Sequence, residues 1–146
     1  MNIAEIQLTY TTSESDKPVI NTPEKAYELS FSIWQHGTME LHEMFVVVLL
    51  NSSKKALGWY KVSSGGICST VVDVPKVFQP ALLGNAYSIL VLHNHPSGNL
   101  SPSRSDIRLT ERLIEAGKIL GIPLDDHLIL SSYDYYSFSE EGYMPD

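Results

Sequence analysis

Residues 88–106 have the sequence SILVLHNHPSGNLSPSRSD, and this stretch decides the fold. The apolar run at 88–92 predicts a buried strand, and the polar stretch 93–102 that follows it predicts a loop. Ser103 with Asp106 three residues later fits a capping box, which predicts that a helix begins near Ser103. The sequence therefore predicts a strand–loop–helix unit at the centre of the domain.

Three polar side chains in this unit form a candidate metal site. His93 and His95 are two residues apart at the exit of the predicted strand, so both imidazoles leave it on the same face. Asp106 lies one turn into the following helix, and the loop can fold that turn back over the strand end. Two imidazoles, one carboxylate and a water form the open ligand set typical of a catalytic zinc ion.

A metal-dependent hydrolase also needs a group that handles the proton of the attacking water. Glu43 is the candidate, because it directly precedes the most apolar run in the chain, 44–50, where burial favours a raised pKa. Ser103 can donate a hydrogen bond to the oxyanion that develops on a carbonyl. Each feature has an ordinary alternative: surface histidines, a plain helix cap, or a strand-edge carboxylate. Their combination in one unit favours a catalytic site.

The remaining pattern predicts an α/β domain with a mixed sheet and helices on both faces. Expected strands lie at 44–50, 56–61, 67–72, 127–131 and 135–138, with those at 56–61 and 67–72 paired antiparallel, and alternation of Ile6, Leu8 and Tyr10 predicts a short strand near the start. Expected helices run from the Thr22 cap to Gly37, over 74–83 up to Gly84, and from near Ser103 to Gly121. We expect a single domain over 1–146, with an N-terminal strand and helix in 1–40 and the catalytic part in 41–140.

Composition limits the partners of the chain. Its 146 residues carry 10 Lys and Arg against 17 Asp and Glu, a net charge of −7, which argues against direct DNA binding. No apolar run approaches ~18 residues and the N-terminus lacks a signal-peptide pattern, so no membrane association is expected. The single cysteine, Cys68, excludes an intramolecular disulfide and fits a reducing, cytoplasmic location; we expect it to be buried in a strand.

Two further groups have both an ordinary and a functional interpretation. Asp126 and His127 precede a predicted strand; a structural role is favoured over a hydrogen bond near the site, and His127 is not assigned as a ligand. Arg104, Arg108 and Arg112 recur every four residues and predict a solvated helix face. The alternative for Arg104, the one nearest the motif, is a contact with substrate or phosphate.

The spacing of these residues resembles a known family motif. His93-x-His95-Pro96 followed by Ser103-x-x-Asp106 is similar to the JAMM motif of the MPN+/JAB metalloproteases, and the wording HNHPSG at 93–98 is similar to the RadC branch. The resemblance covers about residues 40–140. It implies a RadC-like JAB/MPN domain: a cytidine-deaminase-like, three-layer α/β/α sandwich.

The resemblance also implies an activity. It implies one zinc ion held by His93, His95 and Asp106 with a water, Glu43 as general acid/base, and Ser103 as support for the oxyanion. The expected function is that of a zinc-dependent metallohydrolase, a peptidase or isopeptidase acting on a peptide or protein substrate, because JAMM relatives cleave such bonds next to ubiquitin-like modifiers.

Two alternatives come with the same resemblance. One is a DNA-repair accessory protein of the RadC family that does not bind DNA directly, and the other is an inactive MPN scaffold. RadC proteins commonly carry an N-terminal helix-hairpin-helix region. The segment of roughly 40 residues before the catalytic part carries a net negative charge and is expected to be too short for one. Lys76 also stands after Pro75 where the family usually has Arg, which removes bidentate pairing.

Overall fold

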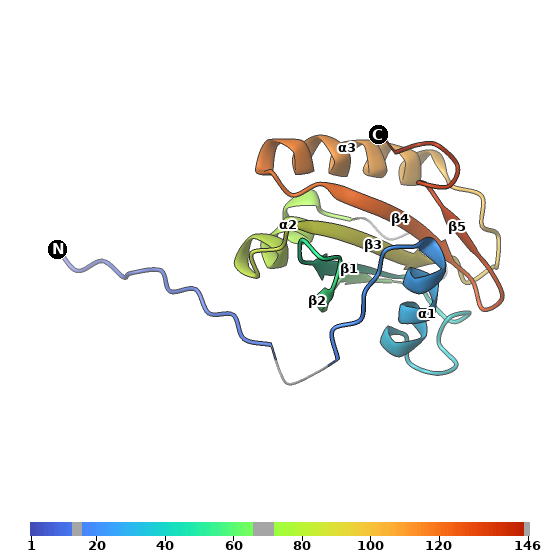
Figure 1. The fold of residues 1–146 in the computed structure, drawn as a ribbon, viewed down its shortest axis with the longest axis horizontal. Coiled ribbons are helices and arrows are strands. Elements are labelled where there is room, and N and C mark those ends of the chain that lie inside the picture. The colour runs from blue at the N-terminus through green and yellow to red at the C-terminus, as the bar shows by residue number, and fades with distance from the viewer. Residues whose placement is uncertain (13–15, 66–71, 145–146) are drawn as a thin grey trace.

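The computed structural model describes residues 1–12, 16–65 and 72–144. In these ranges the helices and strands, labelled in Figure 1, follow in the order α1 (Pro23–Ile33), β1 (Met44–Leu50), β2 (Ala56–Ser64), α2 (Val74–Leu83), β3 (Ser88–Asn94), α3 (Arg104–Leu120), β4 (Leu124–Leu130) and β5 (Tyr135–Ser137). Within the described ranges, no helix is both long and apolar enough to cross a bilayer.

The five strands form one open, mixed sheet in the order β2-β1-β3-β4-β5. β1 runs antiparallel to both β2 and β3, whereas β3 and β4 are parallel. Parallel neighbours need a crossover, which α3 supplies, and the last strand, β5, returns antiparallel to β4. The predicted mixed sheet is confirmed. β3 is its central strand, so the residues that follow β3 lie in the middle of one end of the sheet.

Each face of the sheet carries its own apolar core, because successive strand residues point to opposite faces. Val46, Val48 and Leu50 pack on one face with Ala26 and Ile33 of α1. The other face is covered by α2 and α3, whose core residues include Phe78 and Leu113 and pack against Phe45, Val47 and Val91 of the strands. The predicted three-layer α/β/α sandwich is confirmed (Figure 1).

The helix boundaries follow their caps. Thr22 accepts a hydrogen bond from the Lys25 N–H at 3.2 Å and begins α1 as predicted. The helix ends at Ile33 rather than at Gly37, because Trp34 adopts extended backbone and its ring is buried. α2 spans the predicted range, and α3 ends where Gly121 turns left-handed with φ 73°.

One strand prediction needs correction, and one falls outside the described residues. The predicted strand containing Ile6, Leu8 and Tyr10 does not form: residues 1–12 are extended and solvent-exposed and pair with no strand, because alternation alone supplies no neighbouring edge. The strand at 56–61 is confirmed, continues to Ser64 and pairs antiparallel with β1. Its expected pairing with 67–72 stays a prediction. Residues 66–71, which contain Cys68 and most of the predicted strand 67–72, lie outside the described residues.

Candidate metal centre

Strand β3 delivers two imidazoles to one point at its carboxyl end. His93 is the penultimate residue of β3 and is buried, and His95 follows directly after the strand and is partly open to solvent. Their Nε2 atoms are 3.0 Å apart. The intervening Asn94 points to the opposite face, as strand alternation requires. The sequence prediction that both histidines converge is therefore confirmed.

The first turn of α3 brings a carboxylate to the same point. Asp106 Oδ1 lies 3.4 Å from His93 Nε2, and Asp106 Oδ2 lies 3.4 Å from His95 Nε2. The turn is held in place by a reciprocal cap: Asp106 Oδ2 accepts from the Ser103 N–H at 2.8 Å, and Ser103 Oγ accepts from the Asp106 N–H at 3.0 Å. The capping box and the site are thus one structure, not alternatives.

These three side chains fit a divalent cation. They form a candidate metal-binding group, with one ligand atom from each residue lying within 4.8 Å of the others. Ligands about 2.0 Å from a tetrahedral zinc ion lie about 3.3 Å from one another, close to the distances of 3.0 and 3.4 Å between these atoms. His95 and Asp106 keep 15% of their side-chain area exposed, which leaves an open side to the site.

The loop after β3 fixes the tautomer of His95. The His95 Nδ1–H donates to the Asn99 carbonyl at 2.6 Å, so Nε2 carries the lone pair. The loop can turn back this tightly because Gly98 has a φ of 83°, a left-handed conformation that glycine adopts without strain. The Gly98 N–H closes the turn on the His95 carbonyl at 2.9 Å. The backbone thereby aims one imidazole lone pair at the cluster.

A buried chain of hydrogen bonds fixes the tautomer of His93. The Thr110 hydroxyl donates to the Asp106 carbonyl at 2.7 Å, so its oxygen accepts from the His127 Nδ1–H at 2.7 Å. His127 Nε2 is then unprotonated and accepts from the His93 Nδ1–H at 2.8 Å. This order leaves the lone pair of His93 on Nε2, facing the cluster. Both histidines therefore present acceptors to the Asp106 carboxylate.

Electrostatics agree with a neutral His127 ring. Complete burial lowers the pKa of His127 well below its usual value, which keeps that ring neutral. Burial disfavours the ionised form of Asp106, but its contacts with the His93 and His95 rings and the Ser103 N–H outweigh burial and hold the pKa of the Asp106 carboxyl far below its usual range. For His95, burial works against the proton, but hydrogen bonds to Asp106 and Asn99 and the charge of Glu43 raise its pKa.

Glu43 lies beside this cluster. It is 8% exposed, and its charge acts on His95, which places the carboxylate near the predicted ligands. The preceding loop is held by Asn94, whose amide donates to the Met39 and His42 carbonyls at 2.7 and 2.9 Å and accepts from the Met44 N–H at 2.8 Å. The structure thus brings Glu43 and the three predicted ligands together at one end of the sheet.

Three residues that the sequence did not assign to the site support it. His127 and Thr110 orient His93, and Asn94 holds the loop that carries Glu43. His127 was given a structural role, and the structure adds direct contact with His93. A buried amide between two histidines is a signal that was available, because a buried Asn needs several hydrogen-bond partners. Arg104, by contrast, is exposed, as predicted for a solvated helix face.

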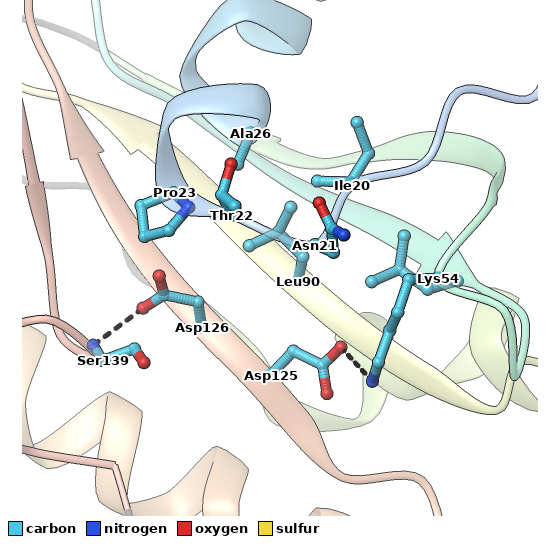
Figure 2. Close-up of a pocket in the computed structure, with 11 residues that line it drawn as sticks. Ile20, Asn21, Thr22, Pro23, Ala26, Lys54, Leu90, Asp125, Asp126 and Ser139 are labelled. Carbon is cyan, nitrogen blue, oxygen red and sulfur yellow. Dashed lines mark hydrogen bonds and ion pairs between the residues drawn. The ribbon is translucent and has the colours of Figure 1, made fainter.

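A second polar cluster occupies the opposite end of the sheet (Figure 2). There a pocket of about 240 Å³ contains the Lys54–Asp125 ion pair, with 2.7 Å between Nζ and Oδ2, and the Ser88 hydroxyl donates to the same oxygen at 3.0 Å. Asp126 accepts from the Ser137 hydroxyl and from the His127 and Ser139 N–H groups. The acceptors of this cluster are thus matched by donors within the chain.

Comparisons with a family model and with individual proteins point to the same family. The model of the RadC-like JAB domain matches residues 20–143. A UPF0758 protein of Salinibacter ruber is 49% identical over 100 residues, which cover 68% of this chain and 43% of the relative. A UPF0758 protein of Halalkalibacterium halodurans is 38% identical over 136 residues, 93% of this chain and 57% of the relative, and one from Methanosarcina mazei is 36% identical over 134 residues, 92% and 57%.

The chain therefore spans about half the length of the curated relatives it matches. Within that span the family match includes both histidines, Asp106 and Glu43. The fold, the cluster and the family match agree, and the chain belongs to the RadC-like JAB domain family.

Proposed function

We propose that the chain is a zinc-dependent metallohydrolase that cleaves peptide or isopeptide bonds in a protein or peptide substrate. The observation that carries this proposal is the convergence of His93 Nε2, His95 Nε2 and the Asp106 carboxylate at 3.0 to 3.4 Å, with both imidazole lone pairs aimed inward. Three ligand atoms at such distances are complementary to a divalent cation, and this ligand set suits zinc with one open position.

The proposal assigns a separate role in hydrolysis to the zinc ion, Glu43 and Ser103. A bound zinc ion supplies a lowered pKa for an attacking water and polarises the scissile carbonyl. Glu43 takes the proton from the attacking water and returns it to the leaving amine nitrogen, a role that its burial next to His95 favours. Ser103 uses its oxygen to cap α3, and its hydroxyl proton is left to donate to the oxyanion.

A single-atom exchange tests the role of Glu43. Glu43→Gln should retain zinc and lower the turnover of peptide and isopeptide substrates by about 10²- to 10⁴-fold, the usual contribution of a positioned general base. Glu40→Gln is the matched control, because Glu40 is an exposed carboxylate three residues earlier. Equal turnover in Glu43→Gln and the wild type would remove Glu43 from the mechanism.

Two substitutions at Ser103 separate the cap from the oxyanion. Ser103→Ala should lower the free energy of unfolding by about 1 kcal/mol through loss of the cap, and it should also lower turnover. Ser103→Asp keeps a capping acceptor but has no proton to donate, so stability should recover while turnover stays low. If Ser103→Asp restores turnover along with stability, the side chain acts only as a cap.

The two alternatives predict other results. A DNA-associated accessory protein would show no turnover in any substrate screen, and a steeply salt-dependent affinity for duplex or branched DNA would revive direct binding despite the net charge of −7. An inactive scaffold would bind zinc without turnover, and Glu43→Gln would then change neither property.

A further inference from the structure

The first twelve residues are an extended segment whose apolar side chains Ile6 and Leu8 lie in solvent. Ile6, Leu8 and Tyr10 occupy alternate positions and are 83, 76 and 43% exposed, and the positions between them hold Gln7 and Thr9. A period of two gives an extended segment one apolar and one polar face. We call residues 1–12 the arm. Figure 1 shows the arm leading away from the body of the molecule.

The sheet offers an edge that suits such a segment. β2 is the outermost strand, with Trp59 and Tyr60 each 50% exposed. The only backbone of the described ranges that bonds to the outer side of this region is that of residues 18–20, where Pro18 accepts from the Ala56 N–H and Ile20 donates to the Lys54 carbonyl. An exposed edge strand is a ready template for another strand.

A groove of about 610 Å³ follows this edge and has apolar walls on both sides. One wall comes from α1, with Leu29 and Ile33, and the other comes from α2, with Pro80 and Leu83. A strand added to β2 would therefore place its apolar side chains against a helix and not in water. Exposed Lys61 on β2 offers a partner for Glu5, the only charged side chain of the arm, while Asp16 adds a negative charge to the groove lining.

We propose that the arm of one molecule adds to β2 in the groove of a second copy, and that the exchange is reciprocal. Tyr10, Thr11 and Thr12 already line one end of the groove of their own chain, and residues 1–9 leave the body from there. Nine extended residues reach about 30 Å, enough to cross to a neighbouring molecule. Because both copies carry the same arm and groove, two exchanges close a two-fold dimer. The interface is independent of the metal cluster.

Molar mass in solution tests the proposal, measured by light scattering behind a sizing column over a range of concentrations. The wild type should be a dimer. Ile6→Glu with Leu8→Glu should weaken the dimer by more than about 100-fold, since each substitution removes a buried apolar side chain. Gln7→Glu with Thr9→Glu adds the same charge on the polar face and should leave the dimer intact. Circular dichroism should show the same folded spectrum for all three proteins, because the arm packs little against its own body.

A third variant tests the groove from its other side. Leu83→Glu places a charge in the α2 wall and should weaken the dimer as the apolar-face pair does. The proposal is overturned if the wild type is a monomer at every concentration, which would leave the arm unpaired or folded on its own edge. It is equally overturned if the apolar-face pair remains a dimer, or if both double variants dissociate alike.

Discussion

The two ends of strand β3 carry polar clusters of similar size but opposite character. At the amino end, Ser88 and Lys54 donate to Asp125, and each strong acceptor has a donor from the chain. At the carboxyl end, His93 and His95 turn lone pairs toward a carboxylate, because their Nδ1 protons are used elsewhere. One end of the strand is satisfied by protein groups alone, and the other end forms a group that could hold a cation.

The difference shows what distinguishes a candidate metal site from an ordinary polar cluster. Acidic and basic side chains gather at both ends, so composition does not distinguish them. The distinguishing feature is the direction of the hydrogen bonds: Thr110 and His127 fix one histidine and the Asn99 carbonyl fixes the other, so that both present acceptors at one point. Groups that orient ligands in this way raise metal affinity as well as fixing geometry.

The largest effect expected from this comparison is on stabilisation by zinc. A ligand that binds only the folded state at about 1,000 times its Kd adds about 4 kcal/mol of stability. Zinc should therefore raise the thermal midpoint of the wild type strongly and that of Asp106→Ala not at all. Asp125→Ala, the matched change at the amino end, should respond as the wild type does. If both variants respond equally to zinc, the two ends are not different in the way described.

The hydrogen-bond chain behind His93 gives the next largest effect. Thr110→Val keeps the shape but removes the oxygen that accepts from His127, so His93 loses its fixed tautomer. Zinc affinity, measured by competition with a chelator of known affinity, should fall about 10- to 100-fold. Thr110→Ser restores the hydroxyl and should restore affinity. Unchanged affinity in Thr110→Val would show that the tautomer is set without this chain.

Asp126 should give the amino end a pH dependence of stability. Burial raises the pKa of its carboxyl above the value in the unfolded chain, although hydrogen bonds from Ser137 and two backbone N–H groups oppose the shift. Folding therefore favours the protonated form: this contribution is fully present below the unfolded pKa of about 3.9 and is lost as pH rises through the folded pKa. Asp126→Asn should remove that loss.

The measurement for Asp126 is the free energy of unfolding by denaturant at several pH values. The wild type should lose more stability than Asp126→Asn as the pH rises from about 4 to neutral, since only the wild type must ionise a buried carboxyl. Ser137→Ala offers a check, because it removes a hydrogen bond that favours the ionised form. Parallel pH profiles for the wild type and Asp126→Asn would refute the assignment.

The smallest effect belongs to the Lys54–Asp125 ion pair. The two side chains are 36 and 25% exposed, so solvent screens their attraction. Asp125→Asn should change the free energy of unfolding by no more than about 1 kcal/mol and leave zinc binding unaltered. A loss of zinc binding in this variant would contradict the comparison, because it would show that the two ends of β3 are coupled although no described hydrogen bond joins this ion pair to the candidate ligands.

The sequence predicts the centre of this molecule better than its margins. The strand at 44–50, the helix over 74–83 and the convergence of His93, His95 and Asp106 follow from local patterns, and the structure confirms them. The strand predicted near Leu8, which does not form, shows the limit of this approach. Alternation determines which residues share a face, but whether a neighbouring strand is available depends on the tertiary structure. The same limit applies to the pairing of β2 with β1.

Local sequence patterns do not predict the contacts of the supporting residues, for the same reason. His127 is separated from His93 by 34 positions, and Asn94 from His42 by 52. These contacts depend on the register of β4 against β3 and on the loop before β1, neither of which a motif specifies. The spacing of the motif therefore predicts the candidate ligands, whereas the orientation of their side chains depends on the tertiary fold.

Metal content tests the central claim most directly. Elemental analysis of the purified, tag-free protein beside His95→Ala, with circular dichroism to check the fold of both, measures what the cluster holds. We predict about one zinc per chain in the wild type and none in His95→Ala. A folded wild type that holds no divalent metal and takes up none when zinc is added would contradict the account, as would equal zinc in the two proteins.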